Sequence, residues 1–341
     1  SSQFPSSLES TVISSFFCPM KKILLYTVMA LTLAGCSNSI DGELVFTEPG
    51  PEDAFHFPYF LFIPDGVSQT GEVCMVVEPN NSGFANDTLQ KHIDKAMRTA
   101  TNDYYMGNYV ARELNAPLLV PVFPRPKSEW WIYAHALDRD VMLQKDNDLE
   151  RIDRQLIAMF EDARRLLAER NIQTCDRFFM TGFSASASFA NRFALLHPDR
   201  VAAVAAGGLN GLLMLPLDSL KGEMLPFPVG TGDFKALTGE DFKKESFLKT
   251  PQFYFMGELD DNDAIPYDDA YSREERELIY RVLDKKMLPD RWEKCRAIYQ
   301  QQNVNATIKT LEGTGHKHPE SVKDKVVEFF RKNPGQDNHG E

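Results

Sequence analysis

The stretch RFFMTGFSAS, residues 177–186, decides the fold class that the sequence predicts. An apolar run over residues 177–181 ends at Gly182, and a helix-like run over residues 187–196 follows Ser184. A strand, a sharp turn and a helix in this order place a serine hydroxyl on a strained turn beyond the strand. Gly182 leaves room for this turn. We therefore predict that Ser184 is a nucleophile and that the N–H of Ala185 stabilises an oxyanion.

Two later motifs supply the groups that such a serine needs. GELD ends an apolar run at Asp260, and GTGH ends another at His316. A serine hydroxyl is a weak nucleophile until a base removes its proton, and a carboxylate can hold that base in place. We predict His316 as the general base and Asp260 as the carboxylate that orients it, giving the chain order Ser, Asp, His.

Neighbouring residues offer alternatives for two of these roles. Asp261 and Asp263 stand beside Asp260, and His318 stands two residues after His316. The segment HKH could bind a metal, but it is not accompanied by a matching cysteine or carboxylate cluster in the sequence. We therefore predict neither a metal nor an organic cofactor.

Apolar runs alternate with amphipathic helices along most of the chain. Helical patterns cover residues 87–114, as one long or broken helix, and 148–170, and a last helix begins at Pro319. This alternation predicts an α/β fold with a mostly parallel sheet and helices on both faces, although the first strands could form an antiparallel hairpin. The strand-like runs lie near residues 59–63, 72–78, 117–123, 177–181, 201–206, 252–256 and 306–311. Insertions are expected at residues 208–250 and 267–303, the second of which is a helical lid or a support for the core.

Two loops are candidates for substrate contacts. The loop after residues 72–78 carries Asn81, which we expect to supply the second oxyanion donor, with Asn80 as the alternative. The loop after residues 117–123 carries Trp130, Trp131 and Tyr133, and ligands of parallel sheets bind beyond the carboxyl ends of the strands. These three aromatic residues could line an acyl, aryl or sugar pocket, or form a hydrophobic plug.

The N-terminal part of the chain has the pattern of an export signal. MKK at residues 20–22 is followed by an apolar run over residues 23–34. The segment LAGC resembles a bacterial lipobox, which implies that Cys36 is lipidated and that the protein is anchored in the cell envelope, at the outer membrane or the periplasmic face. We interpret residues 1–36 as upstream sequence plus signal peptide, residues 37–43 as a tether, residues 44–335 as one domain and residues 336–341 as a tail.

Charge and cysteine content limit the remaining possibilities. The 341-residue chain has a formal net charge of −12, which disfavours a nucleic-acid partner. Beyond the lipobox, Cys74, Cys175 and Cys295 have wide spacings that do not predict a disulfide framework. Cys74 lies in an apolar run and is interpreted as a small core residue.

Residues 57–332 resemble the α/β-hydrolase superfamily, in particular secreted bacterial esterases of the polyhydroxybutyrate-depolymerase-like and feruloyl-esterase-like type. The motifs that carry the resemblance are EPNN (78–81), GFSAS (182–186), residues 257–266 and Gly315-His316. The resemblance implies a Ser-His-Asp acyl-enzyme mechanism without a metal or organic cofactor. Ser186 is a departure, since this family often has glycine there.

These observations favour an envelope-anchored hydrolase of carboxylic esters, acting on small-molecule or polymer-linked esters. A peptidase of the same fold is one alternative, because this superfamily supports several chemistries. A non-catalytic surface lipoprotein that binds glycans or lipids through Trp130 and Trp131 is another.

Overall fold

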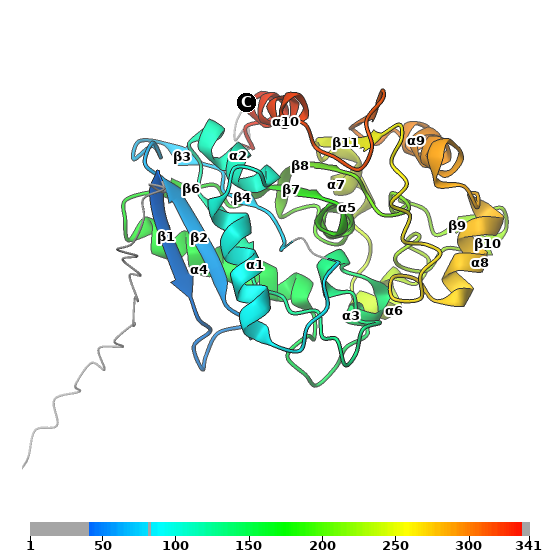
Figure 1. Ribbon diagram of the computed structural model, residues 1–341, viewed down its shortest axis with the longest axis horizontal. Coiled ribbons are helices and arrows are strands. Elements are labelled where there is room, and N and C mark those ends of the chain that lie inside the picture. The colour runs from blue at the N-terminus through cyan, green and yellow to red at the C-terminus, as the bar shows by residue number, and fades with distance from the viewer. Residues whose placement is uncertain (1–40, 81–82, 336–341) are drawn as a thin grey trace, which may run out of the picture.

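The computed structural model describes residues 41–80 and 83–335 (Figure 1). Its main feature is an eight-stranded sheet in the order β1-β2-β5-β4-β7-β8-β11-β12. These strands are β1 (Gly42–Thr47), β2 (Tyr59–Pro64), β4 (Val76–Val77), β5 (Leu118–Pro121), β7 (Phe178–Phe183), β8 (Val201–Gly207), β11 (Gln252–Gly257) and β12 (Ala306–Leu311). Two small ribbons pair β3 (Glu72–Val73) with β6 (Gln173–Thr174) and β9 (Ser219–Leu220) with β10 (Glu223–Met224).

The helices connect these strands and cover both faces of the sheet (Figure 1). They are α1 (Leu89–Thr101), α2 (Met106–Leu114), α3 (Arg139–Met142), α4 (Ile152–Ala168), α5 (Ala185–Leu196), α6 (Phe234–Thr238), α7 (Lys244–Lys249), α8 (Arg273–Val282), α9 (Trp292–Gln301) and α10 (Glu320–Lys332). Two short turns of helix, η1 (Ala134–Ala136) and η2 (Met287–Arg291), complete the set in the described residues.

Strand direction confirms the predicted α/β class. The six strands from β5 to β12 in the sheet order are parallel, whereas β1 and β2 form an antiparallel hairpin that joins β5. β1 begins at Gly42, so the last two residues of the expected tether belong to the sheet. The helical pattern over residues 87–114 is broken, because α1 ends at Thr101 and α2 begins at Met106.

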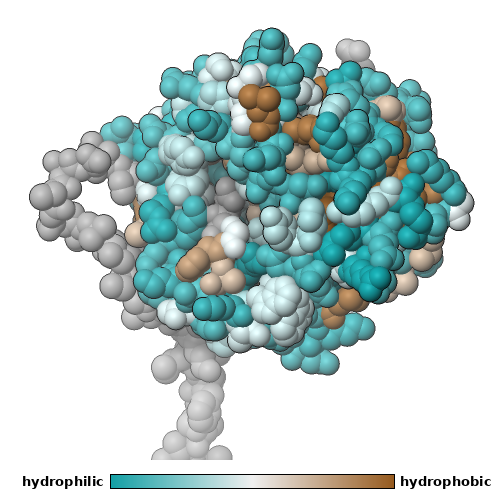
Figure 2. Space-filling model, turned by 45° about the vertical axis from the view of Figure 1, so that its right-hand side comes forward, coloured by the Kyte–Doolittle hydropathy of each residue, from teal (hydrophilic) through white to brown (hydrophobic). Residues whose placement is uncertain are grey.

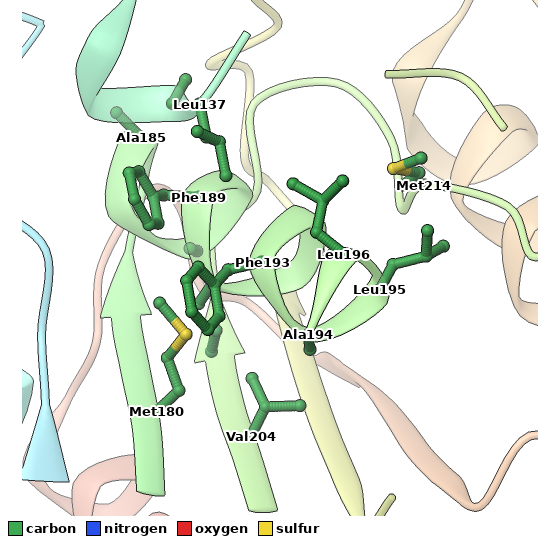
Figure 3. Close-up of a cluster of buried hydrophobic side chains, with 14 of the residues drawn as sticks. Leu137, Met180, Ala185, Phe189, Phe193, Ala194, Leu195, Leu196, Val204 and Met214 are labelled. Carbon is green, nitrogen blue, oxygen red and sulfur yellow. The ribbon is translucent and has the colours of Figure 1, made fainter. Parts of the chain in front are cut away.

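Alternation along each strand creates two hydrophobic layers. On β7, Phe178 and Met180 face one layer, which α4, α5 and α9 cover. Phe179 and Phe183 face the other layer, which α1, α2 and α10 cover. Figure 3 shows Phe193 of α5 directed toward Met180 on β7. Burial on both faces explains why these strands are continuous apolar runs.

The structure corrects one prediction about the cysteines. Cys74 and Cys175 form a disulfide, although their spacing of 101 residues did not indicate one. The pairing of Val73 with Thr174 in the ribbon of β3 and β6 brings the two cysteines together. Cys74 is buried as expected, and Cys295 is a buried free thiol.

Candidate active site

Ser184 occupies a sharp turn between β7 and α5. Its backbone angles are φ 63° and ψ −125°, an uncommon conformation for a residue with a side chain. A Cβ atom on Gly182 would lie 2.6 Å from the Ser186 carbonyl oxygen, so the turn requires glycine there. Ser186 is fully buried, and its hydroxyl contacts both the N–H and the carbonyl oxygen of Phe183 at 2.9 Å. Ser186 therefore braces the turn instead of disturbing it.

Asp260 and His316 lie together beyond the ends of β11 and β12. The His316 Nδ1 atom is 2.9 Å from Asp260 Oδ2, and a carboxylate can only accept, so Nδ1 donates. The second carboxylate oxygen of Asp260 accepts the backbone N–H of Asn262 at 3.0 Å. The Asp260 side chain is 1% exposed and that of His316 is 28% exposed. With a proton held on Nδ1, the other ring nitrogen, Nε2, is left as a hydrogen-bond acceptor.

Close backbone contact holds the two loops together. The Leu259 N–H donates to the Thr314 carbonyl at 2.9 Å, and the Glu258 N–H donates to Leu311. A Cβ atom on Gly257 would clash with the carbonyl oxygens of Thr314 and Gly315. Glycine at position 257 is therefore a requirement for the approach of the loop that carries His316.

Asn262 connects the serine with the histidine. Its side-chain nitrogen Nδ2 lies 3.4 Å from Ser184 Oγ and 3.3 Å from His316 Nε2. Ser184 Oγ and His316 Nε2 are thus both within reach of one amide group, which donates to each. The sequence motifs did not indicate this residue. The available signal was its position two residues after Asp260 in the same strand-end loop.

Of the alternatives to Asp260 and His316, Asp261 is exposed, whereas Asp263 and His318 have other partners. Asp263 pairs with the buried Arg291 at 2.6 Å. The His318 ring packs against Phe183 and Tyr104, with ring centroids 4.6 and 4.9 Å apart. Burial lowers the pKa of His318 to about 4, with Lys323 adding to the effect. His318 is therefore a neutral packing residue at pH 7.

Of the two expected oxyanion donors, only Ala185 lies within the described residues. Ala185 is the first residue of α5, where backbone N–H groups have no partner within the helix. Asn81 lies outside the described residues. The side-chain nitrogen of the alternative, Asn80, is fully buried and donates to the Phe123 carbonyl at 3.0 Å.

A cavity of about 410 Å³ opens beside Asn262. Its walls combine aromatic rings, amides and ion pairs, and they include Trp130, Tyr133 and Tyr267. Trp130 and Trp131 are 46% and 41% exposed and meet edge to face, but Trp131 is not part of the lining. The remaining lining residues are Gly83, Arg125, Asn210, Asn262, Asp263, Ala264, Asp268 and Asp269.

Arg125 organises one wall of this cavity. Its guanidinium lies 3.7 Å from the centre of the Tyr133 ring, and burial raises the pKa of the Tyr133 phenol. It also pairs with Asp269 at 2.7 Å and donates to the carbonyl of Gly83 at 2.6 Å. Arg125 thereby ties the loop after β5 to the insertion that follows Asp263. No sequence motif indicated this arginine.

The expected helical insertion over residues 267–303 is packed into the molecule. Leu278 of α8 and Trp292 and Tyr299 of α9 belong to the hydrophobic layer that also contains α5. The fully buried Arg291 joins the insertion to the carbonyl of Gly211 at 2.8 Å. The helices of this segment therefore support the core, while its first residues line the cavity.

The comparisons with known proteins support the predicted lipid anchor. Residues 20–37 match a prokaryotic membrane lipoprotein lipid attachment site, which supports anchoring through Cys36. This segment lies outside the described residues, among which no helix is both long and apolar enough to cross a bilayer. No curated protein sequence matches the chain.

Several solved structures share the architecture at low sequence identity. Poly(aspartic acid) hydrolase-1 from Sphingomonas sp. KT-1 is 16% identical, with a TM-score of 0.52 over 82% of this chain and 98% of that one. A poly(3-hydroxybutyrate) depolymerase from Bordetella parapertussis is 15% identical, with a TM-score of 0.51 over 87% and 91%. An S-formylglutathione hydrolase from Agrobacterium tumefaciens is 12% identical, with a TM-score of 0.50 over 87% and 98%. Together with the strand order and the turn at Ser184, these likenesses show that the chain has the α/β-hydrolase fold.

Proposed function

We propose that the protein is a serine hydrolase of carboxylic esters, anchored in the cell envelope by a lipid on Cys36. The observation that carries this proposal is the meeting of Ser184, His316 and Asp260 beyond the ends of three strands, with Asn262 in contact with the first two. The shared fold with a poly(3-hydroxybutyrate) depolymerase is consistent with an ester substrate, small or polymer-linked.

The mechanism follows from the positions of these groups. Ser184 Oγ attacks the ester carbonyl while its proton passes to His316 Nε2, and Asp260 stabilises the imidazolium through Nδ1. The oxyanion is held by the Ala185 N–H, with Asn81 as the proposed second donor. The imidazolium then gives its proton to the leaving alkoxide, which departs as the alcohol. Water, activated by His316, hydrolyses the acyl-enzyme and regenerates the serine.

The proposal also assigns a role to the cavity. Trp130 and Tyr133 would contact the acyl or alcohol part of the substrate from the walls of the cavity, and Trp131 would extend this contact on the surface. The cavity is mixed in character, because aromatic rings alternate with paired charges such as Arg125 and Asp269. Such walls suit a substrate that combines a flat or apolar face with hydrogen-bonding groups.

A labelling experiment tests the nucleophile. A fluorophosphonate probe should modify Ser184 in the native protein, as located by mass spectrometry, and the Ser184→Ala variant should not be labelled. That variant should also lose several orders of magnitude in kcat/KM on short acyl esters. Ser219→Ala is the matched control, since Ser219 is exposed on β9 and its hydroxyl contacts Asp218. Retained labelling and turnover in Ser184→Ala would reject the mechanism.

A substrate panel tests the bond that is cleaved. Short acyl esters should be hydrolysed at least an order of magnitude faster than matched peptide amides, because the alcohol is a better leaving group. The reverse order would identify a peptidase of the same fold. If the folded protein hydrolyses neither class but binds a polysaccharide, it is a non-catalytic glycan-binding lipoprotein.

A further inference from the structure

The tether joins the sheet at a defined end of β1. The register forms a continuous row from Leu44 through Phe62, Leu118 and Val76 to Phe179. Because β1 is antiparallel to β2, and β2 is antiparallel to β5, β1 runs in the same direction as the parallel strands. The tether therefore enters at the edge of the sheet where the parallel strands begin.

Local contacts confirm where β1 begins. Asp41 lies 3.6 Å from Arg112, near the end of the helix that precedes β5. Glu43 pairs at 3.0 Å with Arg170, which follows α4 and precedes β6 and β7. In Figure 1 the start of β1 lies on one side of the molecule, whereas α8 and α9 lie on the other.

Ser184 lies beyond the opposite end of its strand. Gly42 is two residues before the row that contains Leu44 and Phe179, and Ser184 is five residues after it. Seven residues of strand correspond to roughly 23 Å along the strand direction. The candidate active site and the tether thus lie at opposite ends of the strands, separated by the length of a strand.

The tether is too short to span this distance along the strands. From Cys36 to Asp41 the chain advances five residues, which reach at most about 18 Å when fully extended. A folded unit of about 300 residues has a radius of gyration of about 19 Å, so its diameter is larger than the tether. A lipid on Cys36 therefore keeps the beginning of β1 near the bilayer in any orientation of the protein.

We propose that the anchor holds the edge around Asp41, Arg112 and Arg170 against the lipid surface and turns the active site toward the aqueous phase. The substrates are then esters carried by soluble molecules or polymers in the aqueous compartment, and the acyl chains of the surrounding bilayer are excluded. The orientation rests on the lipid attachment site, and the substrate source rests in addition on the proposed hydrolase function.

The character of the exposed surface agrees with this orientation. The cavity beside Asn262 includes the charged groups of Asp263, Asp268 and Asp269, whose insertion into a bilayer would be costly. Tyr267 and Trp130 are exposed aromatic residues at the same opening. On the face shown in Figure 2, hydrophobic residues form small separate groups in a mostly hydrophilic surface.

Depth-dependent quenching tests the orientation without any need for catalysis. The lipidated full chain would be placed in phosphatidylethanolamine and phosphatidylglycerol vesicles that contain a spin-labelled headgroup lipid. A fluorophore would be attached to Glu113→Cys, next to Arg112, or to Tyr267→Cys, at the cavity. Because Cys295 is buried and Cys74 is disulfide-bonded, the native chain is the control for background labelling. Stronger quenching at position 113 is expected, whereas equal or stronger quenching at position 267 would overturn the orientation.

A longer tether provides the matched activity test. An insert of about 20 Gly and Ser residues between Ser39 and Ile40 adds a random coil of about 25 Å. The native and long-tether proteins should hydrolyse a water-soluble ester equally. The native protein should hydrolyse an ester embedded in the same vesicles on the order of tenfold more slowly than the long-tether protein. The reason is that the native tether is too short for the candidate active site to reach the bilayer.

The outcomes separate the two proposals. Equal rates of the native and long-tether proteins on the embedded ester, both well above background, would overturn the proposed substrate source. If neither protein hydrolyses either ester, the proposed function fails, and the quenching experiment still decides the orientation.

Discussion

Asn262 places one amide nitrogen between the two atoms that exchange a proton in the proposed mechanism. Its Nδ2 atom donates toward His316 Nε2 and Ser184 Oγ, at 3.3 and 3.4 Å. The amide donates to the lone pair of His316 Nε2, and proton transfer from Ser184 requires the same lone pair. The hydrogen bond from the amide must therefore break when substrate binds. We therefore propose that Asn262 is a positioning residue that aligns His316 Nε2 before the reaction.

We predict that Asn262→Asp moves the acidic limb of the kcat/KM profile to higher pH. A carboxylate at this distance stabilises the protonated imidazole, so the neutral base is available only at higher pH. The acidic limb should therefore move by about one pH unit or more. Asn262→Ala is the control, since it removes the amide without adding charge and should leave the limb nearly in place. A profile of Asn262→Asp that coincides with that of the native enzyme would show that the residue does not face the base.

His318 provides a second prediction at the scale of one residue. Burial lowers its pKa to about 4, from an ordinary value near 6.5. As the pH falls from 6.5 toward 4, the unfolded chain binds a proton at His318 that the folded protein does not bind, so stability is lost over this window. At pH 5 the loss from this group is about 2 kcal/mol relative to pH 7.

We expect His318→Phe to remove this part of the pH dependence. The free energy of unfolding from urea titrations should fall less between pH 7 and pH 5 in the variant than in the native protein, by about 2 kcal/mol. The comparison of the two proteins cancels other groups, such as Glu78, whose pKa burial raises to about 7. An identical pH dependence in both proteins would mean that His318 titrates normally.

At the scale of elements, the insertion of α8, η2 and α9 is joined to the loop that carries Asp260 and Asn262 by one buried arginine. Arg291 is fully buried, pairs with Asp263 at 2.6 Å and donates to the carbonyls of Gly211 and Asp284. Asp263 is three residues after Asp260. The position of the loop that carries Asp260 and Asn262 thus depends on the packing of the insertion.

We predict that Arg291→Met lowers the free energy of unfolding by about 3–5 kcal/mol. The substitution removes a fully buried guanidinium and leaves the partly buried Asp263 carboxylate and the carbonyl of Gly211 without their charged partner. Arg281→Met on α8 is the matched control, because its pair with Glu223 at 3.0 Å is about half exposed and should contribute less than about 1 kcal/mol. Urea denaturation of both variants checks this, and equal losses would contradict the structural role of Arg291.

At the scale of the whole molecule, the disulfide links two parts of the chain that are far apart in sequence. Cys74 precedes β4 and Cys175 precedes β7, two neighbours in the sheet order. Both cysteines lie where these strands begin, the edge opposite Ser184. A disulfide is also compatible with an exported protein, since such bonds persist in oxidising compartments.

We predict that the double substitution Cys74→Ser and Cys175→Ser lowers the free energy of unfolding by about 2–4 kcal/mol, because it releases a constraint on the unfolded chain. Below the unfolding transition, kcat/KM on a soluble ester should be unchanged, since the bond is remote from the active site. A reductant should destabilise the native protein and leave the double variant unaffected. Loss of activity in the folded double variant would contradict this separation of stability from catalysis.

The sequence alone predicted the fold class and the chain order of the three residues proposed to react. Strands buried on both faces are apolar runs, and a nucleophilic turn needs Gly182 and a small residue after Ser184, so both features are local. Asp260 and His316 were predicted as partners of Ser184 for the same reason, as polar residues that end such runs. The lipid attachment site is likewise a continuous pattern of adjacent residues.

Only the tertiary structure decided what depends on contacts between distant segments. The Cys74–Cys175 disulfide, the contact of Asn262 with Ser184 and His316, and the pair of Arg291 with Asp263 each join residues that strand order and loop packing bring together. The side to which the tether attaches was also undecided until the direction of β1 was known. Spacing along a chain records local geometry, whereas these relations arise from the register between strands.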